Sequence, residues 1–178
     1  MQNNKSIVQN SKMLAKGKLI AVRTHTRFVP FPEHSHDYVE IVYMCSGTTT
    51  HKIDGETILL KQGELLFLTP GAKQEILAAG EEDIAVNFII LPQFFDKTLR
   101  LIGEEDNPLK SFIIDCLKNT CPKVSYLHFA VRDVLPVQNL MENLIWTLIE
   151  DTPDKRNTNQ ITMGLVFLHL INCTEKIM

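Results

Sequence analysis

Two histidines and a glutamate lie close together in the run His34-Ser35-His36-Asp37-Tyr38-Val39-Glu40. In an extended strand, side chains an even number of residues apart share a face, so His34, His36 and Glu40 would point the same way. Two imidazoles and a carboxylate are suitable ligands for a divalent transition metal such as zinc, iron, manganese or nickel. The same groups could instead hold a polar small molecule. The residue types leave both chemistries open.

Neighbouring side chains extend this candidate site. Tyr38 and Met44 have the same parity as Glu40, which predicts a pocket with polar and apolar walls, as small-molecule sites usually have. Arg23, on the preceding predicted strand, either clamps an anionic group or lies outside the pocket. The opposite face of the strand is apolar and therefore needs a cover, which the helices near the C-terminus are placed to supply.

The elements that position these residues change character near residue 92. Before Pro92, short segments rich in β-branched and aromatic residues alternate with turn signals, a pattern typical of a β-sandwich or barrel. Asp54-Gly55 predicts a tight hairpin, because both of its turn positions require positive φ. Leu65–Leu68 is a short apolar run, typical of a strand buried on both faces. We expect strands over about 18–27, 39–45, 49–53, 56–60, 65–68 and 84–91.

After Pro92 the apolar residues recur with helical spacing. Asn107-Pro108 predicts a helix start, with the asparagine as N-cap and the proline at the first helical position. Further helices are expected over 136–150 and from Thr158, an expected N-cap, to about 176. The segment 126–131 between them is expected to be an isolated extended stretch.

The last predicted helix is apolar nearly all round from Met163 to Ile171. A helix that covers a barrel from one side needs only one apolar stripe, so a second apolar side needs a second partner. That partner is either the preceding helix or another subunit, since two antiparallel helices can form a self-complementary patch. The residues expected at such a dimer interface are Leu144, Leu148, Leu165, Leu168, His169 and Asn172.

Charge and composition restrict the partners and the compartment. The formal net charge is −3 and no basic stripe is visible, so this chain by itself is not expected to bind a phosphate backbone. Four scattered cysteines without a CxxC pair favour a reducing cytoplasm over a disulfide or zinc framework. No secretory signal is visible, and the apolar stretch 161–171 is too short to span a bilayer, so no membrane association is expected.

The histidine motif has a specific resemblance. HxHxxxExxxxxxG, written here by His34, His36, Glu40 and Gly47, resembles the first sequence motif of the cupin family, and the stretch 63–71 resembles the second. In metal-binding cupins a histidine normally follows that second turn. The matching position holds Gln74, and an amide is a poor ligand for borderline transition metals. Gln74 is therefore expected to be a pocket amide.

A fuller resemblance is to the N-terminal domains of AraC-type transcriptional regulators. The run from His36 to Gly71 is similar to that family's sensor barrel, and the helices from Phe94 onward are similar to its dimerisation segment. The resemblance implies a mainly β fold: a cupin jelly-roll barrel followed by an α-helical dimerisation segment. Its expected parts are an N-terminal arm (1–17), the effector-binding barrel (18–92) and the helical segment packed on the barrel (93–178).

The same resemblance implies the function of a ligand-sensing and dimerisation domain. A small-molecule effector, of which a sugar is one candidate, would bind near His34, His36, Glu40 and Gln74, with no cofactor. The family's helix-turn-helix motifs are absent from the sequence, so DNA would be bound through a domain not contained here. The end of the sequence just after a predicted helix favours a piece of a longer protein.

The alternative is a metal-dependent cupin enzyme, an isomerase or oxygenase, using His34, His36 and Glu40. No nucleophile motif and no phosphate-binding glycine loop supports other catalysis, and Gln74 counts against the metalloenzyme. The remaining distinctive residues have simpler interpretations. His51 is expected in solvent, His128 and His169 at the surface or an interface, and Trp146 in helix packing.

Overall fold

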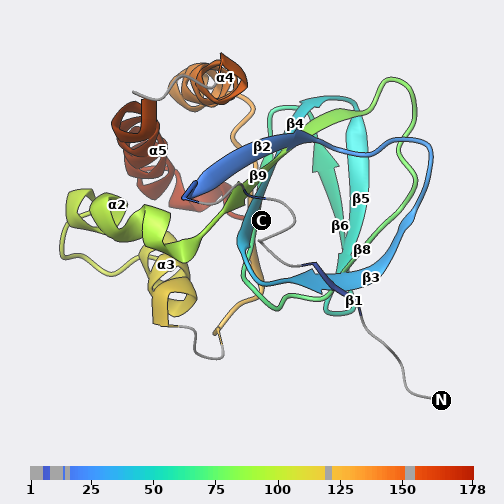
Figure 1. Ribbon diagram of the computed structural model, residues 1–178, viewed down its shortest axis with the longest axis horizontal. Helices are drawn as coiled ribbons and strands as arrows, with labels where there is room; N and C mark the ends of the chain where they lie inside the picture. The colour runs from blue at the N-terminus through green and yellow to red at the C-terminus, as the bar shows by residue number, and fades with distance from the viewer. Residues whose placement is uncertain (1–5, 9–13, 15–16, 119–121, 151–154) are drawn as a thin grey trace.

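Two five-stranded sheets face each other and form the barrel (Figure 1). The computed structural model describes residues 6–8, 14, 17–118, 122–150 and 155–178. One sheet has the order β1-β3-β8-β5-β6, and the other β10-β7-β4-β9-β2. The strand bounds are β1 Ser6–Val8, β2 Ile20–Thr24, β3 Phe31–His36, β4 Val39–Ser46, β5 Thr48–Ile53, β6 Glu56–Lys61, β7 Leu65–Leu68, β8 Gln74–Ile76, β9 Ile84–Ile90 and β10 Tyr126–Phe129.

Strand β4 has two buried faces with different neighbours. Val39, Ile41 and Tyr43 belong to the large apolar core that the helices share with this sheet. Val42 and Met44 belong to a separate core inside the barrel. The predicted apolar cover is therefore confirmed, and one strand connects the barrel interior with the helical layer.

Turn chemistry explains how the strands are connected. Asp54 and Gly55 both have positive φ, 48° and 88°, and they join β5 to β6 as the sequence predicts. Gly47, the glycine of the first cupin-like motif, has φ 69° and lies against Asp83, where an added Cβ would collide with side chain and backbone. Asp83 in turn accepts hydrogen bonds from the backbone N–H groups of Thr48 (2.9 Å) and Gly80 (2.7 Å). Glycine is thus required at this corner of the barrel by conformation and by space.

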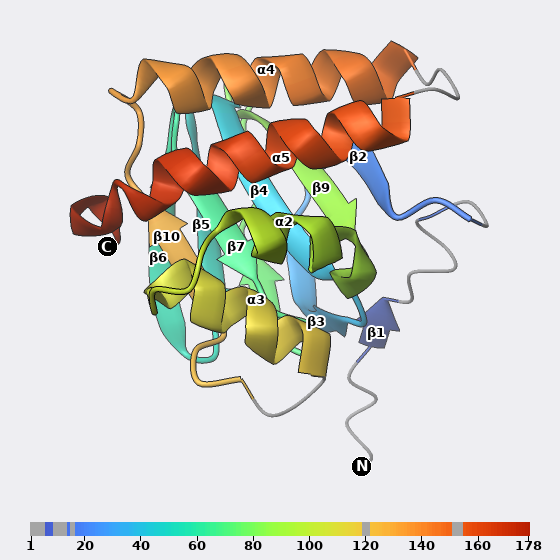
Figure 2. The ribbon, with the colours of Figure 1, turned by 90° about the vertical axis from the view of Figure 1, so that its left-hand side faces the viewer.

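A layer of helices covers the outer face of the β4-containing sheet, with α4 and α5 side by side (Figure 2). The helices are η1 Pro92–Phe95, α2 Asp96–Leu101, α3 Pro108–Lys118, α4 Leu135–Glu150, α5 Arg156–Ile171 and η3 Thr174–Lys176. Asn107 caps α3 as predicted, its side-chain oxygen accepting from the Lys110 N–H at 2.9 Å. Gly103, with φ 82°, follows α2 in the left-handed conformation that commonly ends a helix.

Two elements away from the histidine motif differ from the sequence-based expectations. The segment 126–129 is β10, which pairs antiparallel with β7 rather than standing isolated. Helix α5 begins at Arg156 after Lys155, so Thr158 lies inside the helix and is not its N-cap. In both cases tertiary pairing and packing decided what local patterns had left ambiguous.

Part of the predicted N-terminal arm returns to the barrel. Strand β1 pairs parallel with β3, placing Ser6 opposite His34 and Val8 opposite His36. The remainder of that arm, apart from Leu14 and Gly17, lies outside the described residues. The backbone of β1 thus borders the strand that carries both motif histidines.

Candidate functional site

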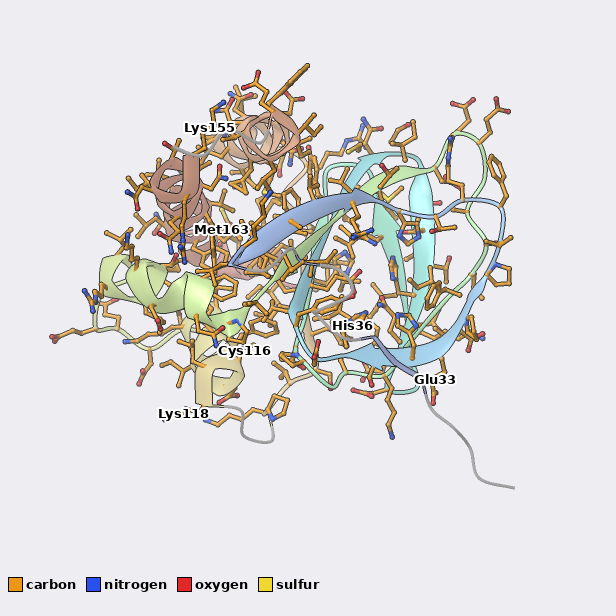
Figure 3. All side chains as sticks on the ribbon, viewed as in Figure 1. Glu33, His36, Cys116, Lys118, Lys155 and Met163 are labelled. Carbon is orange, nitrogen blue, oxygen red and sulfur yellow. The ribbon has the colours of Figure 1, made fainter. Side chains whose placement is uncertain are left out.

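The histidines and the glutamate of the motif come from two sheets. His34 and His36 lie on β3, the chain bends at residues 37–38, and Glu40 lies on β4 in the opposite sheet. The expectation of one continuous strand was therefore wrong, although the three side chains are buried, with 4–5% of their surface exposed. His36 is seen within the barrel in Figure 3. The bend therefore places side chains from both sheets next to each other at the site.

Glu40 is the anionic centre of the site. Its Oε2 accepts hydrogen bonds from His36 Nε2 at 2.8 Å and from Gln74 Nε2 at 3.4 Å. Burial raises the pKa of Glu40, but the hydrogen bond from His36 and the charges of nearby imidazoles outweigh burial, so the pKa lies below its ordinary value. Glu40 is therefore a carboxylate at neutral pH.

A chain of hydrogen bonds leads from Glu40 to the far sheet. Gln74 on β8 points its Nε2 at the carboxylate, which leaves its Oε1 to accept from His51 Nδ1 at 2.8 Å. His51 Nε2 then accepts from the Thr49 hydroxyl, also at 2.8 Å. The acceptor-only carboxylate thus sets the orientation of the amide, and the amide sets the tautomer of His51.

His51 is a site residue that the sequence analysis misplaced. It is fully buried rather than solvated, and burial lowers its pKa to about 4. The neighbouring Lys52 pointed to a surface hairpin, but alternation along β5 turns Lys52 outward and His51 inward. The pattern of burial in β5 was thus readable from the alternation alone.

A cavity of about 370 Å³ opens beside Glu40. Five predicted site residues line it: Arg23, His34, His36, Tyr38 and Glu40. Gln74 and Met44 are buried next to the site without lining the cavity; Met44 Sδ lies 3.5 Å from the Thr49 hydroxyl. The volume of the cavity is within the range of small-molecule binding sites.

Two further polar residues of the cavity were not predicted. His25, directly after β2, is buried, and Asn87 on β9 lies opposite Arg23 of β2 in the register of the two strands. Asn87 was detectable in principle, because it is the one polar residue in the otherwise apolar run 84–90. A lone amide in a buried strand is costly unless something binds it.

Several buried polar atoms of the cavity lack a hydrogen-bond partner within the described residues: His25 Nδ1, His36 Nδ1 and Asn87 Oδ1. Burial lowers the pKa of His25, while the nearby Asn87 side chain acts in the opposite direction without reaching an aligned hydrogen bond. Burial also lowers the pKa of His34, whose Nδ1 lies 2.9 Å from the Pro32 carbonyl oxygen. The three atoms named first, on His25, His36 and Asn87, are available to bind a ligand or water.

Aromatic rings form part of the cavity wall. The rings of His36 and Tyr38 are stacked with centroids 4.6 Å apart, and Phe31 meets His34 edge-on at 4.2 Å. Burial raises the pKa of Tyr38, so its hydroxyl stays protonated. The cavity therefore combines hydrogen-bonding side chains, including the ionisable Arg23 and Glu40, with apolar walls.

The donor set does not fit a metal ion. Within the part of the chain that the structure describes, no three His, Cys, Asp or Glu side chains are grouped closely enough to hold one. His36 and Glu40 are bonded to each other, and the position that supplies a histidine in metal-binding cupins is held by the Gln74 amide. The geometry gives no support to a metal at His34, His36 and Glu40.

The residues expected at a dimer interface are not equally accessible. Leu165 and Asn172 are exposed and Leu148, Leu168 and His169 are half-buried, but Leu144 is fully buried in the core. The exposed apolar side chains of α4 and α5 include Trp146 (66% exposed), Ile149 and Ile161. Trp146 is thus not a packing residue within this chain, contrary to expectation.

The remaining histidines are partly as expected. His169 is half-buried on α5, whereas His128 is buried and its Nε2 lies 2.9 Å from Glu64 Oε1. The interpretation of His128 as a surface residue was therefore wrong. Among the described helices, none has the length and apolar character needed to cross a membrane.

Comparison with known proteins agrees with this fold. The family model of the AraC-like ligand binding domain matches residues 18–159. ToxT from Vibrio cholerae, solved with unsaturated fatty acid bound, is similar with a TM-score of 0.53 and 15% identity, over 89% of this chain and 54% of that chain. An apo form of a ToxT variant has a TM-score of 0.59 and 13% identity, over 90% and 59%. A cupin protein from Bacteroides fragilis is 32% identical over 39% of this chain and 61% of that one, with a TM-score of 0.33. A search of curated proteins found no match.

A barrel of two sheets with a cavity beside Glu40 and a helical layer on one face has the architecture of a ligand-binding domain. The chain belongs to the family of AraC-like ligand binding domains. It spans little more than half the length of the ToxT chains that it matches.

Proposed function

We propose that this domain senses a small-molecule effector in the cavity between the sheets and passes the signal to a DNA-binding domain outside this chain. The observation that carries the proposal is that three buried atoms with no hydrogen-bond partner among the described residues belong to side chains that line one cavity: His25 Nδ1, His36 Nδ1 and Asn87 Oδ1. Buried polar groups are nearly always satisfied, so these atoms are suited to a ligand.

The hydrogen-bonding groups of the cavity suit a polar effector, and a sugar remains a candidate; Arg23 and Glu40 add one ionisable group of each sign to the lining. Sugar hydroxyls both donate and accept hydrogen bonds. They can therefore donate to the amide oxygen of Asn87, and they can bind an imidazole nitrogen whether it donates or accepts. The fatty acid bound by ToxT is a different chemistry. A carboxylate placed deep in this cavity would face Glu40, which is itself ionised.

Strand β4 offers a route from the effector to the helices. Glu40 lies at the cavity, while Tyr43 on the opposite face donates its hydroxyl hydrogen to Gln138 Oε1 of α4 at 2.7 Å. Gln138 Nε2 donates to the carbonyl oxygens of Gly63 at 2.8 Å and Val131 at 3.0 Å. An effector shifts an equilibrium only if it binds two arrangements with different affinity. The position of α4 against β4 is the arrangement we propose to change, with β1 beside β3 as a second movable element.

We further propose that α4 and α5 form a homodimer interface. Of the exposed members of the expected set, Leu165 lies on α5 and Asn172 directly follows it, while the exposed Trp146 and Ile149 lie on α4. Dimer geometry would then set the spacing of two DNA half-sites. In this role the protein acts in the cytoplasm and has no catalytic activity of its own.

The test is a thermal-shift screen of the wild-type chain against neutral sugars, polyols and fatty acids. A compound that binds only the folded state raises Tm with concentration. We expect hits among neutral hydroxylated compounds, and we expect Asn87→Leu to abolish the shift. An exposed control, Lys52→Gln, should retain it. Hits whose shift is unchanged in Asn87→Leu would contradict the proposed site.

A further inference from the structure

A second cavity, separate from the barrel interior, lies between β2 and the ends of α4 and α5. Its volume is about 450 Å³. Figure 2 shows β2 passing beneath the ends of α4 and α5 that are joined to each other, and Figure 3 places Lys155 at that end. The residues that line it differ completely from those of the barrel cavity. The proposal below therefore does not depend on the proposed effector site.

One side of this second cavity is apolar. Leu19, Ile20 and Val22 approach from the β2 side, Phe94 from η1 and Leu148 from α4. Ile20 and Phe94 are buried, whereas Leu148 is half-buried. A ligand with a branched or cyclic hydrocarbon body could cover these surfaces.

The other side is positively charged. Lys18, Lys155 and Arg156 line the cavity, and none of its lining residues in the described part of the chain is acidic. Lys155 also forms an ion pair with Glu150 of α4. The first turn of α5 begins here without an acidic residue and without a side-chain cap. Unsatisfied N–H groups at the start of a 16-residue helix attract an anion in addition to the cationic side chains.

Asn159 supplies an independent indication of a ligand. It lines the cavity, is only 5% exposed, and its Oδ1 has no hydrogen-bond partner among the described residues. Arg156 lies three residues before Asn159 on α5, so these two side chains share one face of the helix, and Lys155 lies at its N-cap. A buried amide oxygen without a partner costs about 1–3 kcal/mol unless a donor reaches it. Asn159 Oδ1 therefore favours a ligand with a hydrogen-bond donor, and the neighbouring cationic side chains favour a ligand with a negative charge.

We propose that this second cavity binds a small apolar hydroxy acid. Its carboxylate would lie at the start of α5 near Arg156, its hydroxyl would donate to Asn159 Oδ1, and its hydrocarbon body would lie on Phe94 and Leu148. A hydroxyl suits the site better than an ammonium group, because three cationic side chains repel a second positive charge. Occupancy would bridge β2 of the barrel and the α4–α5 pair.

The experiment is isothermal titration calorimetry of the full chain with three matched probes. They are 2-hydroxy-4-methylpentanoate, 4-methylpentanoate without the hydroxyl, and the amide of the hydroxy acid without the charge. We expect the hydroxy acid to bind most tightly, roughly threefold to tenfold better than 4-methylpentanoate, as one hydrogen bond allows. The amide should bind least. Absence of binding by all three at millimolar concentration would overturn the proposal.

Variants assign the binding to this cavity. Arg156→Gln should weaken the hydroxy acid several-fold, whereas the matched exposed change Lys52→Gln should not. Asn159→Leu should remove the preference for the hydroxyl while keeping the fold, because leucine replaces an unsatisfied amide with an apolar group of similar size. Asn87→Leu, in the barrel cavity, should leave binding unchanged. If Asn87→Leu abolishes binding, or if Arg156→Gln and Asn159→Leu both bind as the wild type does, the proposal is wrong.

Discussion

The Nε2 atom of His36 lies 2.8 Å from Oε2 of Glu40, and this bond joins the two sheets of the barrel at the wall of its cavity. Both side chains are buried. Because the carboxylate only accepts, it holds the hydrogen of His36 on Nε2 and directs the amide of Gln74, which then directs His51. One buried carboxylate thus orders three other polar side chains.

Removing the charge of Glu40 should therefore loosen the site. Glu40→Gln keeps an oxygen that can accept from His36 Nε2 and Gln74 Nε2, but it removes the negative charge that strengthens both hydrogen bonds. We expect a loss of about 1–3 kcal/mol in the free energy of unfolding, measured by urea denaturation. The exposed change Glu82→Gln should have little effect. Equal stability of Glu40→Gln and the wild type would show that the carboxylate does not organise the site.

The buried histidines predict a loss of stability in mild acid. The pKa of His51 is about 4 in the folded protein against an ordinary value of 6.5. Because the folded-state pKa is the lower one, the unfolded chain takes up the proton first as pH falls, and stability declines from about pH 6.5 toward pH 4. Between pH 7.5 and pH 5 the contribution of His51 is about 2 kcal/mol.

The lowered pKa values of His25 and His34 act in the same direction. Glu40 adds a further loss below its ordinary pKa of 4.5, because its folded-state pKa is also lowered. Urea titrations at a series of pH values measure the slope. His51→Gln should flatten it, and His169→Gln, on the half-buried face of α5, should not. A slope that persists unchanged in His51→Gln would contradict this assignment.

Gln74 provides a test of why the site does not fit a metal. Gln74→His adds a third imidazole to those of His34 and His36, next to the carboxylate of Glu40. Imidazoles and carboxylates are the ligands from which such metal sites are built. We expect this variant to bind zinc or nickel at least tenfold more tightly than the wild type, measured by calorimetry with chelator-treated protein. Equally tight binding by the wild type would mean that the existing side chains suffice.

The bond between Tyr43 and Gln138 should contribute to holding α4 on the barrel. Tyr43→Phe removes the hydroxyl that donates to Gln138 Oε1 at 2.7 Å and should cost about 1 kcal/mol. Amide hydrogen exchange should become faster over 135–150, while the exchange of β9 remains slow. Unchanged protection of α4 would remove this contact from the proposed route.

The exposed apolar side chains of α4 predict the dimer. The wild type should be a dimer by light scattering, and Trp146→Glu combined with Ile149→Glu should give a monomer. Leu135→Glu, at an equally exposed apolar position at the start of α4, should leave the dimer intact. A monomeric wild type would contradict the proposed interface.

Alternating burial and turn chemistry made most of the barrel predictable. The Asp54-Gly55 hairpin, the Asn107 cap and the apolar outer face of β4 all follow from local patterns and are confirmed. The bend between His36 and Glu40 was not predictable, because assignment to one strand or two depends on which sheets the flanking segments join. The same holds for β10, whose pairing partner β7 lies about sixty residues earlier.

The sequence identified the site residues that belong to a recognisable motif and missed those that do not. His25 and Asn87 belong to no motif, and only the fold brings them to the cavity of His36. His51 was misassigned because its charged neighbour Lys52 dominated the local pattern. Trp146 was misassigned for the opposite reason, since helical spacing identifies a face without showing whether the same chain covers it.

The most direct test of the effector site is side-chain and backbone NMR of the chain titrated with the best hit of the thermal-shift screen. The proposed function predicts saturable shifts of the His25 and His36 imidazoles and of the Asn87 amide, together with smaller shifts in α4. Shifts confined to the helices or the surface, with these three residues unchanged, would contradict the claim that the barrel cavity is the effector site.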